Sequence, residues 1–534
     1  MTAPESEIFR GPPAAPRYRT RSLADLITQT AREHPDVKQW YWSDGKLTSA
    51  TLAELDHLAR ELAARLQARG IVKGDRIAVQ MPNRLETAIA YRACFLSGAT
   101  LVPVVHIYGP TELSFILRQS RARLLILPDQ WRQFDFRERI AQLQDCPDLR
   151  DVVFVGEARD AGTLTWRELL AAPAAPFMPV PITASDIALL LYTSGTTSDP
   201  KGVLHSSRSL LGELDQRHAI GEGQHDKTFS PWPAGHIGGF GSLVYPQLVG
   251  NESILMDRWS AREGTELIAR FQVNRAAGVP VVLNEMLDQA EILGIDLSCL
   301  TSFMVGAANV PPLLVQRAEA AGIGVFRCYG SSEHPTISGS LPDAPLAQRA
   351  ESDGPILPGV EVRLLDEAGR DVAYSGEGEI LSRGIELFEG YEDPDLNAEA
   401  FYEDGWFRTG DIGRFQNGNL IITDRKKDII IRGGENISSK EVEDVLSRHP
   451  SVFEAAAFAF PHPRLGEGVA AAVILRPGAN LSQEDVVAYF SSSGIARAKT
   501  PERLFVLDDF PRTPNGKVKK FELRSCIDVE THSL

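Results

Sequence analysis

Cysteine is scarce in this sequence and is not arranged in pairs. The chain has 534 residues and five cysteines, which stand far apart at Cys94, Cys146, Cys299, Cys328 and Cys526. No two of them form a CxxC pair. Disulfide frameworks and structural zinc sites need paired cysteines, so the pattern argues against both. Unpaired cysteines are typical of a reducing compartment, and the sequence therefore predicts a cytoplasmic protein.

Long apolar runs and an excess of basic residues are also absent. No uncharged apolar stretch reaches the roughly 18 residues of a membrane-spanning helix. The polar N-terminal stretch 1–22 lacks the apolar core of a secretion signal. Lys and Arg total 55 against 71 Asp and Glu, which gives a net charge of −16. Because nucleic-acid backbones require clustered positive charge, a general nucleic-acid-binding function is disfavoured, whereas a local site for a small polyanion is not excluded.

Two common catalytic signatures are missing. The Walker A pattern GxxxxGK[ST] does not occur, because Lys201 follows Pro200 and precedes Gly202. The serine-hydrolase elbow GxSxG does not occur either. The sequence therefore offers no support for a P-loop nucleotide hydrolase or for a serine hydrolase.

The hydrophobic pattern predicts an α/β protein of more than one domain, since the length exceeds what one core usually covers. Leucines at steps of three and four predict a helix over 51–70, with Thr51 and Glu54 as its capping box. Short apolar runs alternate with helical patterns to about residue 350, which predicts largely parallel sheets. Residues 359–384 alternate apolar and polar side chains between glycines and predict antiparallel strands. After about residue 424 a smaller α+β unit is expected.

The segment 192-YTSGTTSDPKG-202 is rich in hydroxyls and glycine and follows the apolar run 187-IALLL-191. A glycine-rich turn between a buried strand and a helix directs backbone N–H groups at one point and binds phosphate. Lys201 adds a positive charge, and the helix is expected to begin near Ser206. The alternative interpretation is an ordinary surface connection of Ser, Thr and Gly.

Five motifs occur in a fixed order: YTSGTTSDPKG (192–202), YGSSEHP (329–335), GWFRTGD (405–411), DRKKDIIIRGGENIS (424–438) and PNGKVKK (514–520). In these motifs, over nearly its whole length, the chain resembles the adenylate-forming superfamily, and most closely its acyl-CoA synthetases. It departs from the family pattern where Ser198 and Cys328 replace glycines and Ser332 replaces a threonine. The resemblance implies an N-terminal ATP- and acyl-binding domain over 1–424 with a β subdomain at about 355–424, a hinge at 425–427, and a mobile C-terminal domain over 428–534.

The resemblance also implies the residues that bind ATP. These are Thr193, Ser194, Gly195, Thr196, Thr197, Lys201, Tyr329, Gly330, Ser332, Asp411, Arg425 and Lys517. In this interpretation the 193–202 loop holds the β- and γ-phosphates, and Tyr329 stacks on adenine. Asp411 accepts the two ribose hydroxyls, with Arg425 nearby, and Lys517 contacts both the carboxylate and the α-phosphate. Glu333, with the Thr193 hydroxyl, is expected to hold Mg²⁺, which makes Lys517, Glu333 and Thr193 the predicted catalytic residues.

Acyl and CoA binding follow from the same resemblance. His236, Gly306 and Ala307 are expected beside the acyl group. No acidic residue occurs in 231–241, which disfavours an amino acid, and the small residues favour a medium or long chain or a bulky ring. Lys427 is expected to be the hinge about which the C-terminal domain rotates between two half-reactions. Gly433 and Gly434 would then border the CoA tunnel.

Three functions remain open from the sequence. The first is an AMP-forming acyl-CoA ligase that uses ATP, CoA and a carboxylic acid. The second is an adenylating enzyme that loads a separate carrier protein, since no carrier domain is expected within the chain. The third is a nucleotide-binding protein without catalysis, against which the presence of Glu333, Asp411 and Lys517 argues. A homodimer is compatible with the sequence, which does not decide the oligomeric state.

Overall fold

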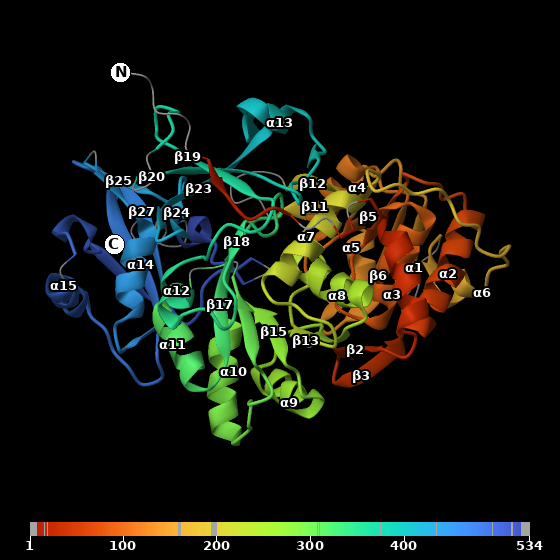
Figure 1. Cartoon of the computed structure of the whole chain (residues 1–534), viewed down its shortest axis with the longest axis horizontal. Coiled ribbons are helices and arrows are strands. Elements are labelled where there is room, and N and C mark those ends of the chain that lie inside the picture. The colour runs from red at the N-terminus through yellow and green to blue at the C-terminus, as the bar shows by residue number, and fades with distance from the viewer. Residues whose placement is uncertain are drawn as a thin grey trace.

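The computed structural model describes residues 8–524 apart from 15–16, 19, 158–161, 194–199, 307, 309, 373–375, 434, 494 and 514–515. Figure 1 shows two large sheets with helices around them, a third sheet above, and the C-terminal residues at the opposite side from the first helices. The predicted α/β class with a large N-terminal region and a smaller C-terminal unit is confirmed.

The first sheet is parallel except at one edge, where β12 and β21 run antiparallel. Its strand order is β10 (Leu164–Thr165), β9 (Asp151–Val155), β6 (Leu124–Pro128), β4 (Arg76–Val79), β5 (Thr100–Pro103), β11 (Ile187–Thr193), β12 (Lys201–Ser206) and β21 (Gly390–Tyr391). Alternate residues of β4 face different cores, because Ile77 and Val79 pack with α2 and α3 while Ala78 packs with α4 on the other face. A small hairpin lies beside this sheet, formed by β7 (Gln130–Trp131) and β8 (Phe134–Asp135).

The second sheet is parallel from β17 to β2. Its order is β18 (Ser338–Gly339), β17 (Gly324–Tyr329), β16 (Ser302–Val305), β15 (Arg275–Gly278), β13 (Lys227–Ser230), β14 (Glu252–Met256), β2 (Lys38–Ser43) and β3 (Lys46–Thr51). The carboxyl ends of its parallel strands all lie at one edge, which is where the candidate site is built.

Helices cover both large sheets. Those of the first 250 residues are α1 (Leu23–Glu33), α2 (Leu52–Ala68), α3 (Leu85–Ser97), α4 (Pro110–Ser120), α5 (Phe136–Ile140), α6 (Trp166–Ala171), α7 (Ser207–Ala219) and α8 (Ile237–Val249). Those around the second sheet are α9 (Ala261–Phe271), α10 (Pro280–Leu293), α11 (Pro312–Ala320) and α12 (Leu346–Glu351). The predicted capping box of α2 is confirmed, since Thr51 and Glu54 exchange both bonds.

The third sheet is antiparallel, as predicted for residues 359–384. It contains β1 (Phe9–Arg10), β19 (Glu361–Leu365), β20 (Glu377–Arg383), β23 (Trp406–Gln416), β22 (Phe401–Tyr402) and β24 (Asn419–Arg425), with α13 (Asp395–Ala400) and the 3₁₀ turn Glu403–Gly405 beside it. No sequence pattern indicates β1, whose Phe9 pairs with Val362 far along the chain.

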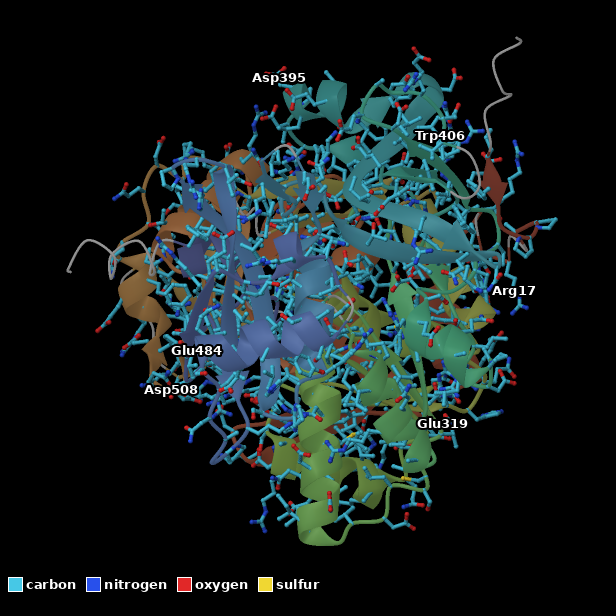
Figure 2. All side chains as sticks on the ribbon, turned by 90° about the vertical axis from the view of Figure 1, so that its left-hand side faces the viewer. Arg17, Glu319, Asp395, Trp406, Glu484 and Asp508 are labelled. Atoms are coloured by element: carbon cyan, nitrogen blue, oxygen red, sulfur yellow. The ribbon has the colours of Figure 1, made fainter. Side chains whose placement is uncertain are left out.

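The C-terminal sheet has its own core, in which Ile430, Val445 and Phe490 are buried. Its strands are β26 (Glu435–Ile437), β25 (Ile430–Arg432), β28 (Gly466–Leu475), β27 (Val452–His462) and β29 (Arg503–Val506), with α14 (Ser439–Ser447), α15 (Gln483–Ser492) and the 3₁₀ turn Arg497–Lys499. Figure 2 shows this blue unit lying across the front of the molecule, with Glu484 of α15 on it, while Glu319 of α11 lies beside the green ribbon at lower right. The hinge and the exact domain limits stay predictions.

Candidate functional site

The hydroxyl-rich segment 192–202 connects two antiparallel strands. Thr193 at the end of β11 pairs with Lys201 at the start of β12. Residues 194–199, and with them Ser194, Gly195, Thr196 and Thr197, lie outside the described residues. The expectation that the loop runs directly into a helix is wrong. A helix does begin at the predicted place, with Ser206 as its N-cap, but β12 separates it from the loop. The N-terminus of this helix therefore follows a strand and not the loop itself.

The segment 329–337 follows β17 and folds back tightly on itself. A Cβ atom on Gly330 would lie 1.9 Å from the carbonyl oxygen of Pro335, so only glycine fits here. The carbonyl of Ser332 accepts a hydrogen bond from Nε2 of the buried His205, at 2.8 Å. Burial lowers the pKa of His205 to about 4, so this imidazole is neutral near pH 7 and holds the segment as a fixed donor. His205 is a supporting residue that the sequence analysis did not identify.

Glu333 is held from the opposite side by the first sheet. Its Oε1 accepts the hydroxyl of Tyr391 at 2.7 Å, and its carbonyl accepts the Phe388 N–H at 2.8 Å. Burial and the Glu333 carboxylate raise the pKa of Tyr391, so its hydroxyl remains a donor. The ammonium of Lys201 lies 5.3 Å from the centre of the Tyr391 ring. Tyr391 thus joins two predicted residues from distant motifs, and no local sequence signal marks it.

Asp411 lies between two other predicted residues. Its Oδ2 accepts the Tyr329 hydroxyl at 2.8 Å, and its Oδ1 lies 3.2 Å from Nε of Arg425. Asp411 and Arg425 face each other across β23 and β24, so the antiparallel register brings the two motifs together. The carboxylate is buried, which gives its interactions more strength than at the surface.

Lys517 reaches this group from the C-terminal unit. Its loop is closed by bonds between Thr513 N–H and the Lys517 carbonyl, at 2.7 Å, and between Lys517 N–H and the Thr513 hydroxyl, at 3.1 Å. Burial, followed by the Arg425 charge, lowers the pKa of Lys517 to about 8, while Asp411 and Glu333 act in the opposite direction. Charged groups from three motifs that are remote in sequence therefore lie within electrostatic range of this one ammonium group.

The expected acyl residues border the same place. His236 is half-buried and precedes α8, and its buried Nε2 has no hydrogen-bond partner among the residues described. Burial, with the Lys517 charge as a lesser cause, lowers its pKa to about 4. Gly306 follows β16, and a Cβ there would lie 3.0 Å from the Cys328 carbonyl. Ala307 lies outside the described residues.

The expected hinge and tunnel residues lie farther along the chain. Lys427 is in a turn closed by the Asp428 N–H and the Arg425 carbonyl, at 2.8 Å, and burial lowers its pKa. Gly433 has a positive φ of 61°, and its N–H donates to the Leu465 carbonyl at 2.8 Å. Gly434 lies outside the described residues.

Comparison with known proteins shows the class of enzyme that this fold and site define. A model of the AMP-binding enzyme family matches residues 27–392, and the model of its C-terminal domain matches residues 441–517. The chain belongs to this family, which confirms the resemblance to adenylate-forming enzymes. It is an enzyme of the acid–thiol ligase class.

Particular relatives extend over nearly the whole chain. A medium-chain fatty-acid–CoA ligase of Escherichia coli is 35% identical and covers 95% of this chain and 90% of its own length. A 2-hydroxy-7-methoxy-5-methyl-1-naphthoate–CoA ligase of Streptomyces carzinostaticus is 31% identical, and the match covers 96% of this chain and 94% of that ligase. One similar solved structure is that of o-succinylbenzoate CoA synthetase from Bacillus subtilis in complex with its acyl-adenylate intermediate. It has a TM-score of 0.81 at 25% identity, and the match covers 95% of this chain and 99% of that chain.

The described part of the chain adds two further observations. Within it, no helix has the length and apolar character needed to cross a bilayer. Its cysteines Cys94, Cys146, Cys299 and Cys328 are all free.

Proposed function

We propose that this enzyme activates a carboxylic acid with ATP and transfers the acyl group to CoA. The carboxylate attacks the α-phosphate and releases pyrophosphate, and the thiol then displaces AMP from the acyl-adenylate. The observation that supports this most strongly is the position of Lys517. Its ammonium, carried by the C-terminal unit, is within electrostatic range of Asp411 and Glu333 of the N-terminal region and of Arg425 of the predicted hinge.

The first half-reaction brings two anions together, so it needs positive charge where negative charge develops. Lys517 and the partly exposed Arg425 supply that charge. The neutral His236 adds no competing charge, and its Nε2 is available to a substrate oxygen. Asp411 is positioned by Tyr329 and Arg425 and is assigned to the ribose hydroxyls.

The residues at Glu333 fit a magnesium ion. Tyr391 occupies Oε1 of this carboxylate, and Oε2 has no hydrogen-bond partner within the described structure. Mg²⁺ takes one or two protein oxygens and keeps water and phosphate oxygens as its other ligands. In the described residues no group of three or more His, Cys, Asp and Glu is gathered for a metal, which fits such a sparse site. Glu333 would hold the ion with Thr193, and the ion would neutralise phosphate charge.

CoA is the proposed acceptor because several curated relatives, among them the two described above, are named as CoA ligases. Those two act on acids of very different shape, a medium-chain fatty acid and a substituted naphthoate. We infer a medium or long chain, or a bulky cyclic acid, for this enzyme as well. Cytoplasmic location and a homodimer stay predictions.

ATP–pyrophosphate exchange over a panel of acids tests the proposal. We expect exchange to depend on the acid and on Mg²⁺, and we expect AMP to be released only when CoA is added. Replacing CoA by a phosphopantetheinylated carrier protein distinguishes the alternative acceptor. If none of the acids in the panel supports ATP–pyrophosphate exchange, the result would contradict the proposed function and favour a nucleotide-binding protein without catalysis.

A further inference from the structure

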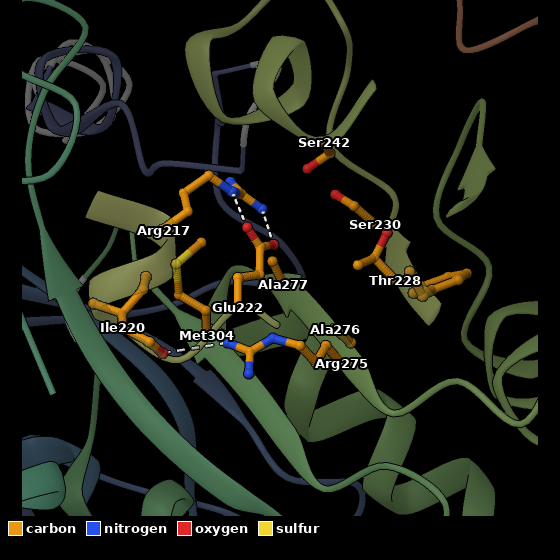
Figure 3. A pocket seen from close by; sticks show the side chains of 11 residues that line it. Arg217, Ile220, Glu222, Thr228, Ser230, Ser242, Arg275, Ala276, Ala277 and Met304 are labelled. Carbon is orange, nitrogen blue, oxygen red and sulfur yellow. Dashed lines mark hydrogen bonds and ion pairs between the residues drawn. The ribbon is translucent and has the colours of Figure 1, made fainter. Parts of the chain in front are cut away.

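A small cavity lies beneath the candidate site, between α7 and α8 on one side and β13, β15 and β16 on the other. Its volume is about 20 Å³, which is enough for one water molecule. Part of its wall is apolar, formed by Ala276, Ala277 and Met304 (Figure 3). The rest is polar and includes a buried ion pair, which is unusual for a pocket that would receive only an alkyl chain.

The cavity and the candidate site lie at two levels of the second sheet. The second sheet's strands run from the cavity to the site: β15 leads from Arg275, on the cavity wall, to Val279, beside the Lys517 loop. The three residues of strand from Arg275 to Gly278 span roughly 10 Å. On α8, Ser242 lines the cavity and lies roughly 9 Å along the helix axis from His236. An acid whose carboxylate is beside His236 and Lys517 would therefore direct its far end here.

The polar wall is formed by Arg217 and Glu222. Arg217 donates from Nε and Nη2 to the two oxygens of Glu222, both at 2.5 Å. Its guanidinium lies 5.4 Å from the centre of the Tyr245 ring. Nη1 has no hydrogen-bond partner among the described residues, so one donor group of a buried cation remains unused.

Serine hydroxyls complete this wall. Figure 3 shows Ser230 and Ser242 turned toward the Arg217–Glu222 pair. The Ser230 oxygen accepts the Trp232 N–H at 3.2 Å, which leaves its own hydrogen to donate. The Ser242 hydroxyl donates to the Gly238 carbonyl at 2.9 Å, which leaves its oxygen able to accept.

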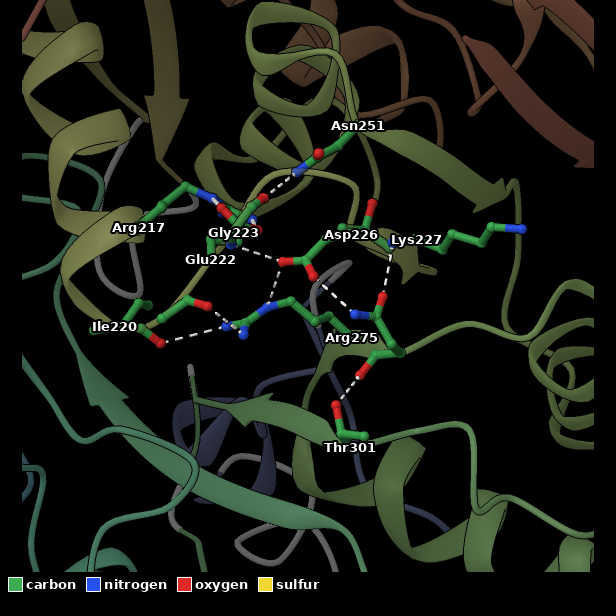
Figure 4. Close-up of polar contacts among 12 residues, drawn as sticks. Arg217, Ile220, Glu222, Gly223, Asp226, Lys227, Asn251, Arg275 and Thr301 are labelled. Carbon is green, nitrogen blue, oxygen red and sulfur yellow. Dashed lines mark hydrogen bonds and ion pairs between the residues drawn. The ribbon is translucent and has the colours of Figure 1, made fainter.

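A second layer of contacts fixes the ion pair in place (Figure 4). Arg275 donates to the carbonyls of Gly221, at 2.7 Å, and Ile220, at 3.3 Å. Its Nε lies 3.5 Å from Asp226, which also accepts the Gly223 N–H at 2.8 Å. Because the turn that carries Glu222 is held at both ends, the pair is a rigid part of the wall.

We propose, on the basis of the proposed function, that the acid substrate carries a neutral oxygen group, a hydroxyl or a carbonyl, at its end remote from the carboxylate. That oxygen takes the place of one water and binds Nη1 of Arg217 and the Ser230 hydroxyl. A methyl group there leaves these donors buried and unpaired, which costs affinity. A second carboxylate is disfavoured, because Glu222 already neutralises Arg217 and Asp226 neutralises Arg275.

Matched pairs of acids with equal numbers of chain atoms test this proposal: 6-hydroxyhexanoate with heptanoate, 8-hydroxyoctanoate with nonanoate, and 10-hydroxydecanoate with undecanoate. ATP–pyrophosphate exchange gives kcat/KM for each acid. We expect the hydroxy acid to be preferred by at least about 10-fold in the pair whose length fits, because a site that hydrogen-bonds a hydroxyl rejects the analogue that lacks it. We expect octanedioate to be poorer than 8-hydroxyoctanoate.

The double variant Arg217→Met with Glu222→Gln removes both charges, so that neither residue is left as an unpaired buried charge. It should lose the preference for the hydroxy acid and favour the alkyl acid. The matched control is Arg327→Met with Asp353→Asn, another buried pair with distances of 2.8 and 3.0 Å, which should keep the wild-type ratio. If the double variant does not fold, Ser230→Ala should still reduce the preference several-fold.

If kcat/KM is higher for the alkyl acid, or equal for the two acids, in every one of the three pairs, the proposal is overturned. The proposed function would then remain intact. A wild-type preference in the Arg217–Glu222 variant would overturn it as well. Exchange with none of the acids would count against the proposed function itself.

Discussion

Two loops of the C-terminal unit lie in opposite surroundings. The loop closed by Thr513 and Lys517 reaches the site, where the Lys517 ammonium interacts with Arg425, Asp411 and Glu333. The turn between β25 and β26 carries Gly433, and close to it Ile431 is 55% exposed. One unit therefore presents a cation to the site and keeps its glycine turn outside. In our proposal the first half-reaction uses this arrangement, and the second half-reaction needs the two loops to exchange places.

The largest expected effect is on the Lys517 loop. Lys517→Ala removes a charge that is needed only where carboxylate and phosphate meet. Adenylate formation should fall by about 10²–10⁴-fold, the size typical for one preorganised charge partner. Thioester formation from pre-made acyl-adenylate and CoA should stay near the wild-type rate.

Both half-reactions are measured separately, and Lys519→Ala is the matched control. Lys519 is close in sequence, is 30% exposed and pairs with Glu522 at 2.7 Å. If Lys517→Ala slows both half-reactions equally, the prediction that the Lys517 loop acts only in adenylate formation is contradicted.

The pH dependence of adenylation gives the next largest effect. With a pKa of about 8, Lys517 is charged below that pH and loses its proton as the pH rises through it. The kcat/KM of ATP–pyrophosphate exchange, which reports the free enzyme, should therefore fall about tenfold per pH unit above about pH 8. An exchange rate that stays constant to about pH 9.5 would contradict the role of the Lys517 charge.

Gly433 tests the other loop. Gly433→Leu should leave adenylation unchanged and slow thioester formation by about tenfold, because a side chain would narrow the passage for pantetheine. Gly478→Leu is the control for backbone strain, since Gly478 has a similar φ of 75° and is in a different turn of the same unit. Equal effects of the two variants on thioester formation would assign the loss to strain.

The smallest expected effect concerns the contact that holds the C-terminal unit in place. Asp424, just before the predicted hinge, accepts the Ser439 N–H at 2.6 Å and its hydroxyl at 3.1 Å, across the residues that would rotate. Asp424→Asn should weaken this contact by about 1 kcal/mol and slow adenylation about fivefold, with thioester formation unaffected. Asp508→Asn, on an exposed side chain, is the control, and a decrease in thioester formation alone would contradict the prediction.

The candidate site can be predicted from sequence where its residues lie within motifs. Glu333, Asp411 and Lys517 each stand in a short pattern that is recognised without knowledge of its neighbours. His205 and Tyr391 cannot be found in this way, because their partners, Ser332 and Glu333, are far away in sequence. The helix after the 192–202 loop begins where the sequence predicts it, at Ser206. The intervening β12 is not predicted, since a short strand near a sheet edge has no strong period of its own.

The sequence by itself determined the α/β class, the capping box of α2, the antiparallel third sheet and the motifs that the site contains. These depend on local periodicity and on residue type, which act over a few neighbouring residues. Only the tertiary structure decided that Phe9 joins β19, that Lys517 comes within electrostatic range of Asp411 and Arg425, and that Arg217 and Glu222 line a cavity. The reason is physical: strand pairing, burial and charge interaction depend on which distant segments pack together, and packing is a property of the whole chain.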